Sequence, residues 1–240
     1  MATNKHSMCK RASSDQNRMF SSIAGQYDFL NHLLSLNIDR RWRRELAKYA
    51  RVKPGDNILD VCTGTGDVAI RFAQADDAGE IVGIDLSEEM LQIARWKTKR
   101  KAPGEKIKLL RVDALKLPFR DNCFDIVSIG FGLRNIGHYK KGISEMVRIL
   151  RGGGRLVILE FSPPRGSLFG TCYGLYLDLI IRTVGGVISG SASAYRYLCT
   201  SIANFLEPEE IIELMKEEGL KELYSERLSG GIAYIYRGEK

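Results

Sequence analysis

The sequence predicts an α/β protein with a doubly wound, mostly parallel sheet of seven strands. Strand-like apolar runs alternate with helical patterns from residue 57 to residue 160, which is typical of βα units. A glycine turn, Gly64-Thr65-Gly66, links the first apolar run to the first helix. The chain ends in two strand-like runs around Gly230-Gly231, which predict a C-terminal antiparallel hairpin. The length of 240 residues suits one large domain.

The expected elements follow in chain order. A polar tail, residues 1–16, has the composition of a disordered segment, and residues 17–240 form the single domain. Residues 17–50 are expected to be a helical cover, in which Asp39 caps the second helix. The five expected parallel strands are residues 57–61, 80–85, 107–112, 124–130 and 154–160. Helices are expected at about 68–74, after a Ser87 cap, at 139–150 and at 208–218, and the hairpin strands at 222–227 and 232–236.

Residues 163–206 interrupt the alternation. They are rich in Gly, Tyr, Leu and Ile, with Asp178 and Arg182 inside the apolar run. This composition predicts either a cap over a bound cofactor or an apolar channel for a substrate. An ordinary pair of packing helices is the alternative.

Composition and charge restrict the class of protein. The net charge of +7 admits an anionic membrane surface or nucleic acid as a partner. The basic clusters at residues 40–44 and 97–101 are interpreted first as solvated surface, and the first of them, flanked by apolar residues, could also touch lipid headgroups. No uninterrupted apolar run approaches about 18 residues, so no membrane-spanning helix is expected. The five cysteines contain no C-x-x-C pair, which favours reduced thiols in a cytoplasmic protein and gives little support to a metal site.

Two cofactors fit the glycine turn. Residues 64–69 match the G-x-G-x-x-G/A pattern of dinucleotide sites, and Asp85 follows at the spacing of a ribose-binding acid. The alternative is S-adenosylmethionine, for which the turn is D-x-x-T-G-T-G beginning at Asp60. That cofactor has no pyrophosphate and does not need a helix N-terminus for an anion. Its amino-acid end carries an ammonium, which suits a carboxylate and backbone carbonyls.

Acids after the next two expected strands help to choose between these cofactors. Asp85 can accept hydrogen bonds from both ribose hydroxyls, which both cofactors require. Asp113-Ala114 follows the third strand, where a carboxylate can accept from the adenine N6 amine. A dinucleotide fold has no strict need of an acid at that position. Asp113 therefore favours S-adenosylmethionine.

Several longer motifs then occur in the order of a known family. They are YDFLN at residues 27–31 with Ser35 and Trp42, DVCTGTGD at 60–67, DALKLPFRDNCFD at 113–125, FGLRN at 131–135, RILRGGGRLVILEFS at 148–162 and AYRYL at 194–198. In these motifs the chain resembles the quinone-biosynthesis C-methyltransferases, which methylate demethylmenaquinone and the ubiquinone precursor ring. The similarity runs from about residue 19 to residue 237, nearly the entire chain.

The resemblance implies a Rossmann-like class I methyltransferase fold with S-adenosyl-L-methionine as cofactor. The implied reaction is C-methylation of a prenylated quinol ring in menaquinone or ubiquinone biosynthesis, with demethylmenaquinol to menaquinol as the first choice. The expected cofactor-binding residues are Asp60, Thr63, Gly64, Gly66, Asp85, Leu86, Asp113, Ala114 and Gly130. The expected substrate-binding residues are Tyr27, Asn31, Tyr195 and Tyr197. No metal is expected.

The chain departs from the family's usual residues at four positions. Asp39 stands where the family often has His, Gly130 where Ser sometimes occurs, and Gly152 and Leu206 where Pro is common. None of these departures removes a cofactor carboxylate. Gly130 can contact the cofactor only through its backbone.

The chemistry of methyl transfer points to the loop after the fourth expected strand. In-line displacement requires alignment of nucleophile, methyl and sulfur, and the ring carbon becomes nucleophilic when a neighbouring hydroxyl loses its proton. Arg134 is expected to stabilise the resulting oxygen anion, and Asn135 to orient the hydroxyl or a water. A salt bridge from Arg134 to Asp125 or Glu160 is the structural alternative. The base stays open among His32, His138, Asp28, Tyr195, Tyr197 and water.

The expected partners are the prenylated quinol and, by peripheral contact, the inner face of the membrane; a homodimer is left open. Nucleic acid is not expected, because Ser162-Pro163-Pro164-Arg165 lacks the aromatic residue that ends the motif of amino-methyltransferases acting on nucleic acid. Two rival functions remain. One is methylation of RNA or a small soluble metabolite, and the other is a non-catalytic cofactor-binding protein.

Overall fold

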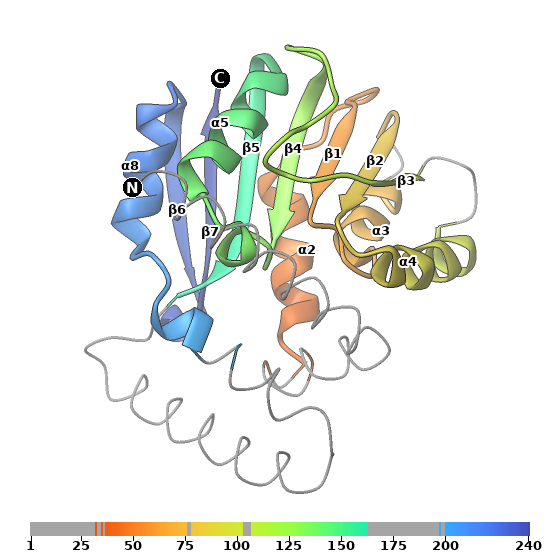
Figure 1. Cartoon of the computed structure of the whole chain (residues 1–240), viewed down its shortest axis with the longest axis horizontal. Coiled ribbons are helices and arrows are strands. Elements are labelled where there is room, and N and C mark those ends of the chain that lie inside the picture. The colour runs from red at the N-terminus through yellow and green to blue at the C-terminus, as the bar shows by residue number, and fades with distance from the viewer. Residues whose placement is uncertain are drawn as a thin grey trace, which may run out of the picture.

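A seven-stranded sheet forms the centre of the protein (Figure 1). The structure, a computed structural model, describes residues 32, 35, 37–75, 78–102, 107–162, 197 and 200–240. The strand order is β3-β2-β1-β4-β5-β7-β6. The strands are β1 (Ile58–Val61), β2 (Ile81–Asp85), β3 (Ile107–Arg111), β4 (Phe124–Gly130), β5 (Leu150–Phe161), β6 (Lys221–Leu228) and β7 (Ala233–Glu239).

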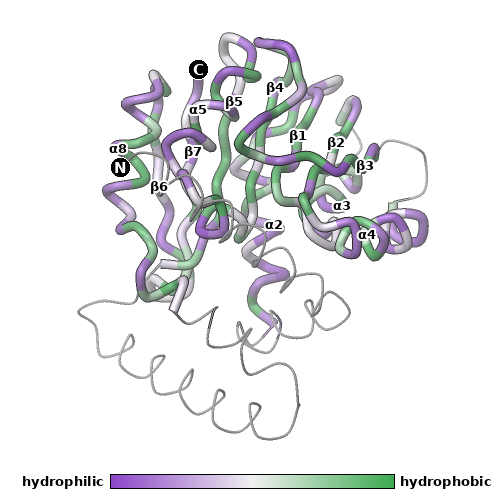
Figure 2. The backbone as a smooth tube through the Cα atoms, viewed as in Figure 1, coloured by the Kyte–Doolittle hydropathy of each residue, from purple (hydrophilic) through white to green (hydrophobic). Residues whose placement is uncertain are grey.

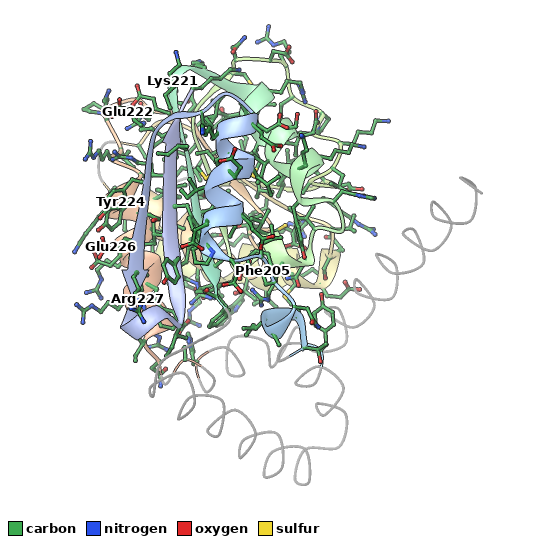
Figure 3. The ribbon with its side chains drawn as sticks, turned by 90° about the vertical axis from the view of Figure 1, so that its left-hand side faces the viewer. Phe205, Lys221, Glu222, Tyr224, Glu226 and Arg227 are labelled. Carbon is green, nitrogen blue, oxygen red and sulfur yellow. The ribbon has the colours of Figure 1, made fainter. Side chains whose placement is uncertain are left out.

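The directions of the strands confirm the predicted fold class. β1 to β5 run parallel to one another, whereas β7 is antiparallel to both β5 and β6. The C-terminal hairpin thus completes a mostly parallel sheet, and β6 forms its outer edge from Lys221 to Arg227 (Figure 3). Because β4 lies beside β1 and not beside β3, the chain reverses its direction of winding between β3 and β4, and a ligand site is expected at the carboxyl ends of the strands there.

Helices cover both faces of the sheet. The longer helices in the described chain are α2 (Asp39–Tyr49), α3 (Asp67–Ala73), α4 (Glu88–Lys101), α5 (Tyr139–Ile149) and α8 (Pro208–Glu217). One hydrophobic cluster joins Trp42, Leu46 and Phe72 of α2 and α3 to one face. A second cluster packs Met146 of α5 and Met215 of α8 on the other. Figure 2 shows the hydrophobic colour concentrated along β4 and β5, between these layers.

Most predicted elements lie within one or two residues of their observed bounds, but β5 starts four residues earlier than expected. Leu150 already pairs with Phe124, and the register then shifts, so that Arg155 lies opposite Ile126. The intervening glycines, including Gly153 with φ of +74°, form an irregular stretch of the strand. The sequence gives no sign that Leu150 would pair first, because three glycines separate it from the apolar run of the expected strand.

The start of α2 also differs from the prediction. Ile38 occupies the N-cap position and makes no side-chain capping bond. Asp39 lies inside the first turn, where its buried carboxylate accepts hydrogen bonds from Ser35 at 2.7 Å and from Arg43. The capping role predicted for Asp39 was wrong, because a charged partner binds the carboxylate more strongly than a helix N–H. Ser87, in contrast, caps α4 as predicted by accepting the Met90 N–H at 3.3 Å.

Parts of the predicted organisation lie outside the described residues. These are the polar tail, most of the helical cover before Asp39, and residues 163–196 of the expected cap. At the end of that segment Ile202 and Phe205 are buried, and Phe205 meets the Tyr139 ring edge-on at 5.5 Å. None of the helices in the described part of the chain combines the length and apolar character needed to span a membrane.

The loops that follow β1 and β4 pack directly against each other. Cys62 and Phe131, the residues immediately after these strands, both have positive φ, at 53° and 59°. A Cβ added to Gly132 would lie 2.5 Å from the Cβ of Cys62. Only glycine fits at position 132 while these two loops keep their conformations.

We therefore predict that Gly132→Ala lowers the free energy of unfolding by about 1–3 kcal/mol, since the added methyl group must push the two loops apart. Gly152→Ala is the matched control, because a Cβ there meets nothing within 4 Å. Urea denaturation of both variants measures the difference. Equal stability of the two variants would show that the loops can separate without cost.

Candidate active site

The candidate site lies at the carboxyl edge of the parallel strands. The arrowheads of β1, β2 and β4 point toward the side where α2 begins (Figure 1). The loops that leave this edge are the glycine turn after β1, the turn at Asp113 after β3 and residues 131–135 after β4. Parallel strands bring these loops together although they are far apart in the sequence.

The glycine turn is fixed by hydrogen bonds from its own N–H groups. Thr63 N–H donates to the Ile84 carbonyl at 2.8 Å, and Gly66 N–H to the Thr63 carbonyl at 2.9 Å. Gly64 N–H donates to a carboxylate oxygen of Asp85 at 2.9 Å. Gly64 and Gly66 adopt φ of +56° and +85°, which accounts for the two glycines. These three N–H groups are therefore used within the protein and do not serve an anion.

The carboxylate of Asp60 binds the glycine turn and the neighbouring strand β4. Its carboxylate accepts the Thr63 hydroxyl at 2.6 Å and the Ser128 hydroxyl of β4 at 2.7 Å, and its side chain is buried. Burial raises the pKa of Asp60 to about 6, against the lowering effect of the Thr63, Ser128 and Ala69 hydrogen bonds. The carboxylate thus joins β1, β4 and the glycine turn.

Asp85 is the last residue of β2, and both of its carboxylate oxygens accept hydrogen bonds. One oxygen accepts from Gly64 N–H and the other from Ser87 N–H, both at 2.9 Å. Burial raises the pKa of Asp85, partly offset by these backbone hydrogen bonds. The Leu86 N–H also bonds to this carboxylate, which has about four acceptor positions, so about one remains for a ribose hydroxyl. The neighbouring Leu86 is 40% exposed, which places an apolar surface beside the carboxylate.

Asp113 and Ala114 form the turn after β3. The exposed Asp113 accepts the Leu115 N–H at 2.9 Å through one carboxylate oxygen, and its carbonyl accepts the Lys116 N–H at 3.0 Å. Val112 N–H donates to the Asp85 carbonyl at 3.0 Å, so this turn is joined to the end of β2. The two acids that the sequence assigned to ribose and adenine therefore lie on neighbouring loops.

Lys97 is a contributor to this site that the sequence did not indicate. The basic run 97–101 was interpreted as a solvated face, but Lys97 is buried. Its ammonium lies 2.5 Å from a carboxylate oxygen of Asp67 and donates to the Thr65 hydroxyl at 2.9 Å. Lys97 therefore anchors the glycine turn to α4.

Arg134 forms a buried ion pair with Glu160. One terminal nitrogen, Nη1, lies 2.5 Å from Glu160 Oε1 and also donates to the Phe131 carbonyl at 2.8 Å. Both side chains are almost completely buried, at 1% and 0% exposure. The structural alternative weighed from the sequence, a salt bridge to Glu160, is thus present, whereas Asp125 pairs with Arg151. Arg134 holds the loop after β4 on β5.

Asn135 and Tyr197, which the sequence assigned to catalysis and to substrate binding, are hydrogen-bonded to each other. The Tyr197 hydroxyl donates to Asn135 Oδ1 at 3.0 Å. The Asn135 amide donates to the Phe131 carbonyl at 3.4 Å. Tyr27, Asn31 and Tyr195 lie outside the described residues. The structure thus links one of the expected substrate residues to the loop after β4.

Two further residues near the turn have defined surroundings. Gly130 ends β4, and a Cβ on it would approach Val68 of α3 at 3.0 Å, so even alanine would be tight there. Burial and the nearby carboxylates, Asp85 first among them, raise the pKa of the Cys62 thiol well above its usual value. A thiol that stays protonated is a poor nucleophile, so Cys62 fits a packing role.

The donor set favours S-adenosylmethionine over a dinucleotide. A pyrophosphate needs N–H groups directed at it, but those of Thr63, Gly64 and Gly66 are bonded within the protein. Asp60 and Asp85, whose pKa values are raised, would instead gain from a cationic ligand. A ligand with an ammonium and ribose hydroxyls matches these groups.

The sequence could have indicated some of the residues that support the site, but not others. Glu160 interrupts an otherwise apolar strand, LVILEF, and a buried charge requires a partner. Ser128 and Gly83 look like ordinary strand residues. A Cβ on Gly83 would lie 3.0 Å from the Thr63 hydroxyl, a relation that only the sheet register creates.

Comparison with known proteins gives a consistent family. The model of the ubiE/COQ5 methyltransferase family matches residues 8–240. A Thermus thermophilus protein named demethylmenaquinone methyltransferase is 44% identical over 222 residues, which cover 92% of this chain and 100% of the relative. A Geotalea uraniireducens protein named ubiquinone/menaquinone biosynthesis C-methyltransferase UbiE is also 44% identical, over 92% of this chain and 94% of that protein.

Solved structures share the fold at low sequence identity. A Thermotoga maritima S-adenosylmethionine-dependent methyltransferase, described as a possible histamine N-methyltransferase, has a TM-score of 0.66 at 20% identity and covers 93% of this chain and 98% of that one. Phosphoethanolamine N-methyltransferase 2 of Haemonchus contortus, in complex with S-adenosyl-L-methionine, has a TM-score of 0.62 at 17% identity, over 81% of this chain and 51% of that one. These likenesses concern the fold alone.

The raised pKa of Asp60 predicts opposite pH effects on cofactor affinity and on stability. Below pH about 6 Asp60 takes up a proton and loses its charge, so if it faces the cofactor's ammonium as expected from the sequence, affinity should fall by up to about tenfold per pH unit. The folded protein holds this proton more tightly than the unfolded chain does. The contribution of Asp60 to stability is therefore greatest below pH about 4 and is lost as pH rises through about 6.

Calorimetric titration of S-adenosylmethionine between pH 5 and about pH 7.5 tests the first effect. In Asp60→Asn the cofactor should bind more weakly at neutral pH, with a flatter dependence. Asp85, whose pKa is also raised, accounts for any slope that remains. An Asp60→Asn variant that keeps the full wild-type slope would contradict the assignment to Asp60.

The burial of the Arg134–Glu160 pair predicts a large loss of stability in Arg134→Met. This change leaves the Glu160 carboxylate buried without its cation, which should cost about 3–5 kcal/mol of unfolding free energy. Arg95→Met is the control, because Arg95 and Glu88 form an exposed pair at 2.6 Å that should contribute about 1 kcal/mol or less. Denaturant unfolding of both variants decides the matter, and similar losses would mean that solvent reaches the Arg134–Glu160 pair.

Proposed function

The chain belongs to the ubiE/COQ5 methyltransferase family, and we propose that it transfers a methyl group from S-adenosylmethionine to a ring carbon of a prenylated quinol. Demethylmenaquinol is the proposed substrate and menaquinol the product. The observation that supports this most is similarity along the full length of a relative named demethylmenaquinone methyltransferase. A prenylated benzoquinol is the second candidate, because other relatives are named for both quinones.

The proposed cofactor contacts use the loops at the carboxyl edge. Asp85 holds a ribose hydroxyl through its remaining acceptor position, with Leu86 against the apolar side of the nucleoside. Asp113 and Ala114 border the adenine. Asp60, Thr63, Gly64 and Gly66 shape the turn for the amino-acid end, and Gly130 contributes backbone only. Bound S-adenosylmethionine would supply an electrophilic methyl group on a sulfonium.

For the ring, we propose that the loop after β4 sets the position of the reacting oxygen. Asn135 is oriented by Tyr197 and by the Phe131 carbonyl, so its amide can direct a ring hydroxyl. Arg134 orients this loop through Glu160, and because its side chain is buried we propose that it supports the ring oxygen by holding the loop in place. Deprotonation of that hydroxyl makes the neighbouring carbon nucleophilic.

The prenyl tail requires an apolar surface near the same edge. We propose that residues 163–206 and the N-terminal helical segment provide it, and that Tyr27, Asn31, Tyr195 and Tyr197 bind the substrate. Peripheral contact with the inner face of the membrane would use the exposed arginines of α2, which are Arg40, Arg41 and Arg44. A homodimer remains a further proposal.

The test is transfer of isotope from labelled S-adenosylmethionine into a short-tailed demethylmenaquinol analogue by the purified chain. Labelled menaquinol is the expected product, and a demethylbenzoquinol analogue and RNA are run in parallel. Label in RNA or in a small soluble metabolite alone would overturn the proposal. Cofactor binding without transfer to any acceptor would indicate a non-catalytic protein.

A further inference from the structure

A histidine and a buried aspartate form a dyad beside the candidate site. Nδ1 of His32 lies 2.9 Å from both carboxylate oxygens of Asp39. Asp39 is 1% exposed, whereas the His32 side chain is 19% exposed. Ser35 and Arg43 also donate to the Asp39 carboxylate, which holds it in one orientation.

The dyad fixes which nitrogen of His32 carries the proton. Burial raises the pKa of Asp39, but Arg43, Ser35 and His32 together bring it below its usual value, so the carboxylate is ionised near neutral pH. An ionised carboxylate can only accept, so Nδ1 must be the donor. The neutral imidazole then presents Nε2 as an acceptor, which is the arrangement of a base oriented by a carboxylate. In the part of the chain that the structure describes, no hydrogen bond occupies Nε2.

A short series of contacts connects the dyad to the loop after β4. The Arg43 guanidinium, bound to Asp39, lies 5.2 Å from the centroid of the Phe131 ring. The Phe131 carbonyl accepts hydrogen bonds from Arg134 and Asn135. Arg43 also lowers the pKa of Asp67, the first residue of α3 after the glycine turn, against the effect of burial. The dyad is therefore joined through Arg43 to both loops of the site.

Resting on the proposed function, we propose that His32 is the general base that removes the proton from the ring hydroxyl of the quinol. Nε2 accepts the hydroxyl proton, and the O–H electron pair passes into the ring. The ring carbon then forms its bond to the methyl carbon as the C–S bond breaks, with that electron pair remaining on sulfur. Loss of the ring C–H proton to solvent restores aromaticity, and the proton on His32 returns to the ring oxygen.

The two other candidate bases in the described chain fit less well. His138 is exposed and stands at the N-cap position of α5, where its side chain makes no capping bond. Tyr197 already donates its hydroxyl proton to Asn135.

Three variants of the full chain separate catalysis from structure. His32→Ala should lower kcat about 100-fold or more while S-adenosylmethionine affinity changes less than about twofold, and added imidazole should restore part of the rate. His32→Asn keeps a side-chain N–H able to donate to Asp39 but has no second ring nitrogen. It should therefore be as slow as His32→Ala. His138→Ala is the matched control and should keep the wild-type kcat.

The pH–rate profile provides a second readout. The wild-type kcat should fall on the acid side and this limb should be absent from His32→Ala, because a base that already carries a proton cannot accept one from the quinol. The charged groups around the imidazole are Asp39 and Arg43 of α2, with Asp67 of α3 beyond Arg43. All three keep their charge where the limb is expected, because the pKa values of both acids are lowered and the guanidinium stays protonated.

Several outcomes would overturn the assignment. Wild-type kcat in His32→Asn would show that only the hydrogen bond to Asp39 matters, and loss of cofactor affinity in His32→Ala would indicate a structural role. Loss of kcat in His138→Ala with rescue by imidazole would move the base to His138. Failure of the proposed function is distinguishable, because the wild-type protein itself would then not methylate the quinol analogue.

Discussion

The buried carboxylate of Asp60 is the constraint on which the cofactor end of the site depends. It binds the hydroxyls of Thr63 and Ser128, and so joins the turn after β1 to the neighbouring strand β4. Burying a carboxylate is unfavourable unless donors compensate it. Two hydroxyls and the Ala69 N–H compensate the Asp60 carboxylate only in part, since its pKa remains raised to about 6. A cation at the turn would complete the compensation.

The buried ion pair of Arg134 and Glu160 organises the loop that is proposed to bind the substrate. Glu160 accepts from the guanidinium of Arg134 and from two backbone N–H groups, those of Arg134 and Phe161. The rings of Trp42, Phe131 and Phe161 pack together beside this pair, with centroids 4.6–6.1 Å apart. Because Trp42 belongs to α2, the N-terminal helix is fixed to the same loop that carries Asn135. The His32–Asp39 dyad is therefore positioned by the aromatic cluster as well as by its own hydrogen bonds.

The sequence predicted those features that depend on local pattern. Periodicity and turn chemistry account for the alternation of strands and helices, for the Ser87 cap and for the position of Asp85 at the end of β2. What it could not predict arises from tertiary contacts. From the sequence alone Asp39 is predicted to cap a helix, but in the structure it binds Arg43 and His32. Lys97 is likewise predicted to be solvated, but the packing of α4 on the glycine turn pairs it with Asp67. The early start of β5 depends on a pairing with Phe124 that no local signal announces.

The negative potential at the carboxyl edge bears on how the spent cofactor leaves. After burial, Asp85, Asp60, Glu160 and Asp113 all raise the pKa of the Cys62 thiol, so the field at this point is negative. S-adenosylmethionine brings a sulfonium into that field, whereas S-adenosylhomocysteine carries a neutral sulfide. Each methyl transfer removes one positive charge from a place that attracts cations. With the cofactor bound as proposed, product inhibition should be weaker for that reason, and the same carboxylates should favour exchange of spent for fresh cofactor.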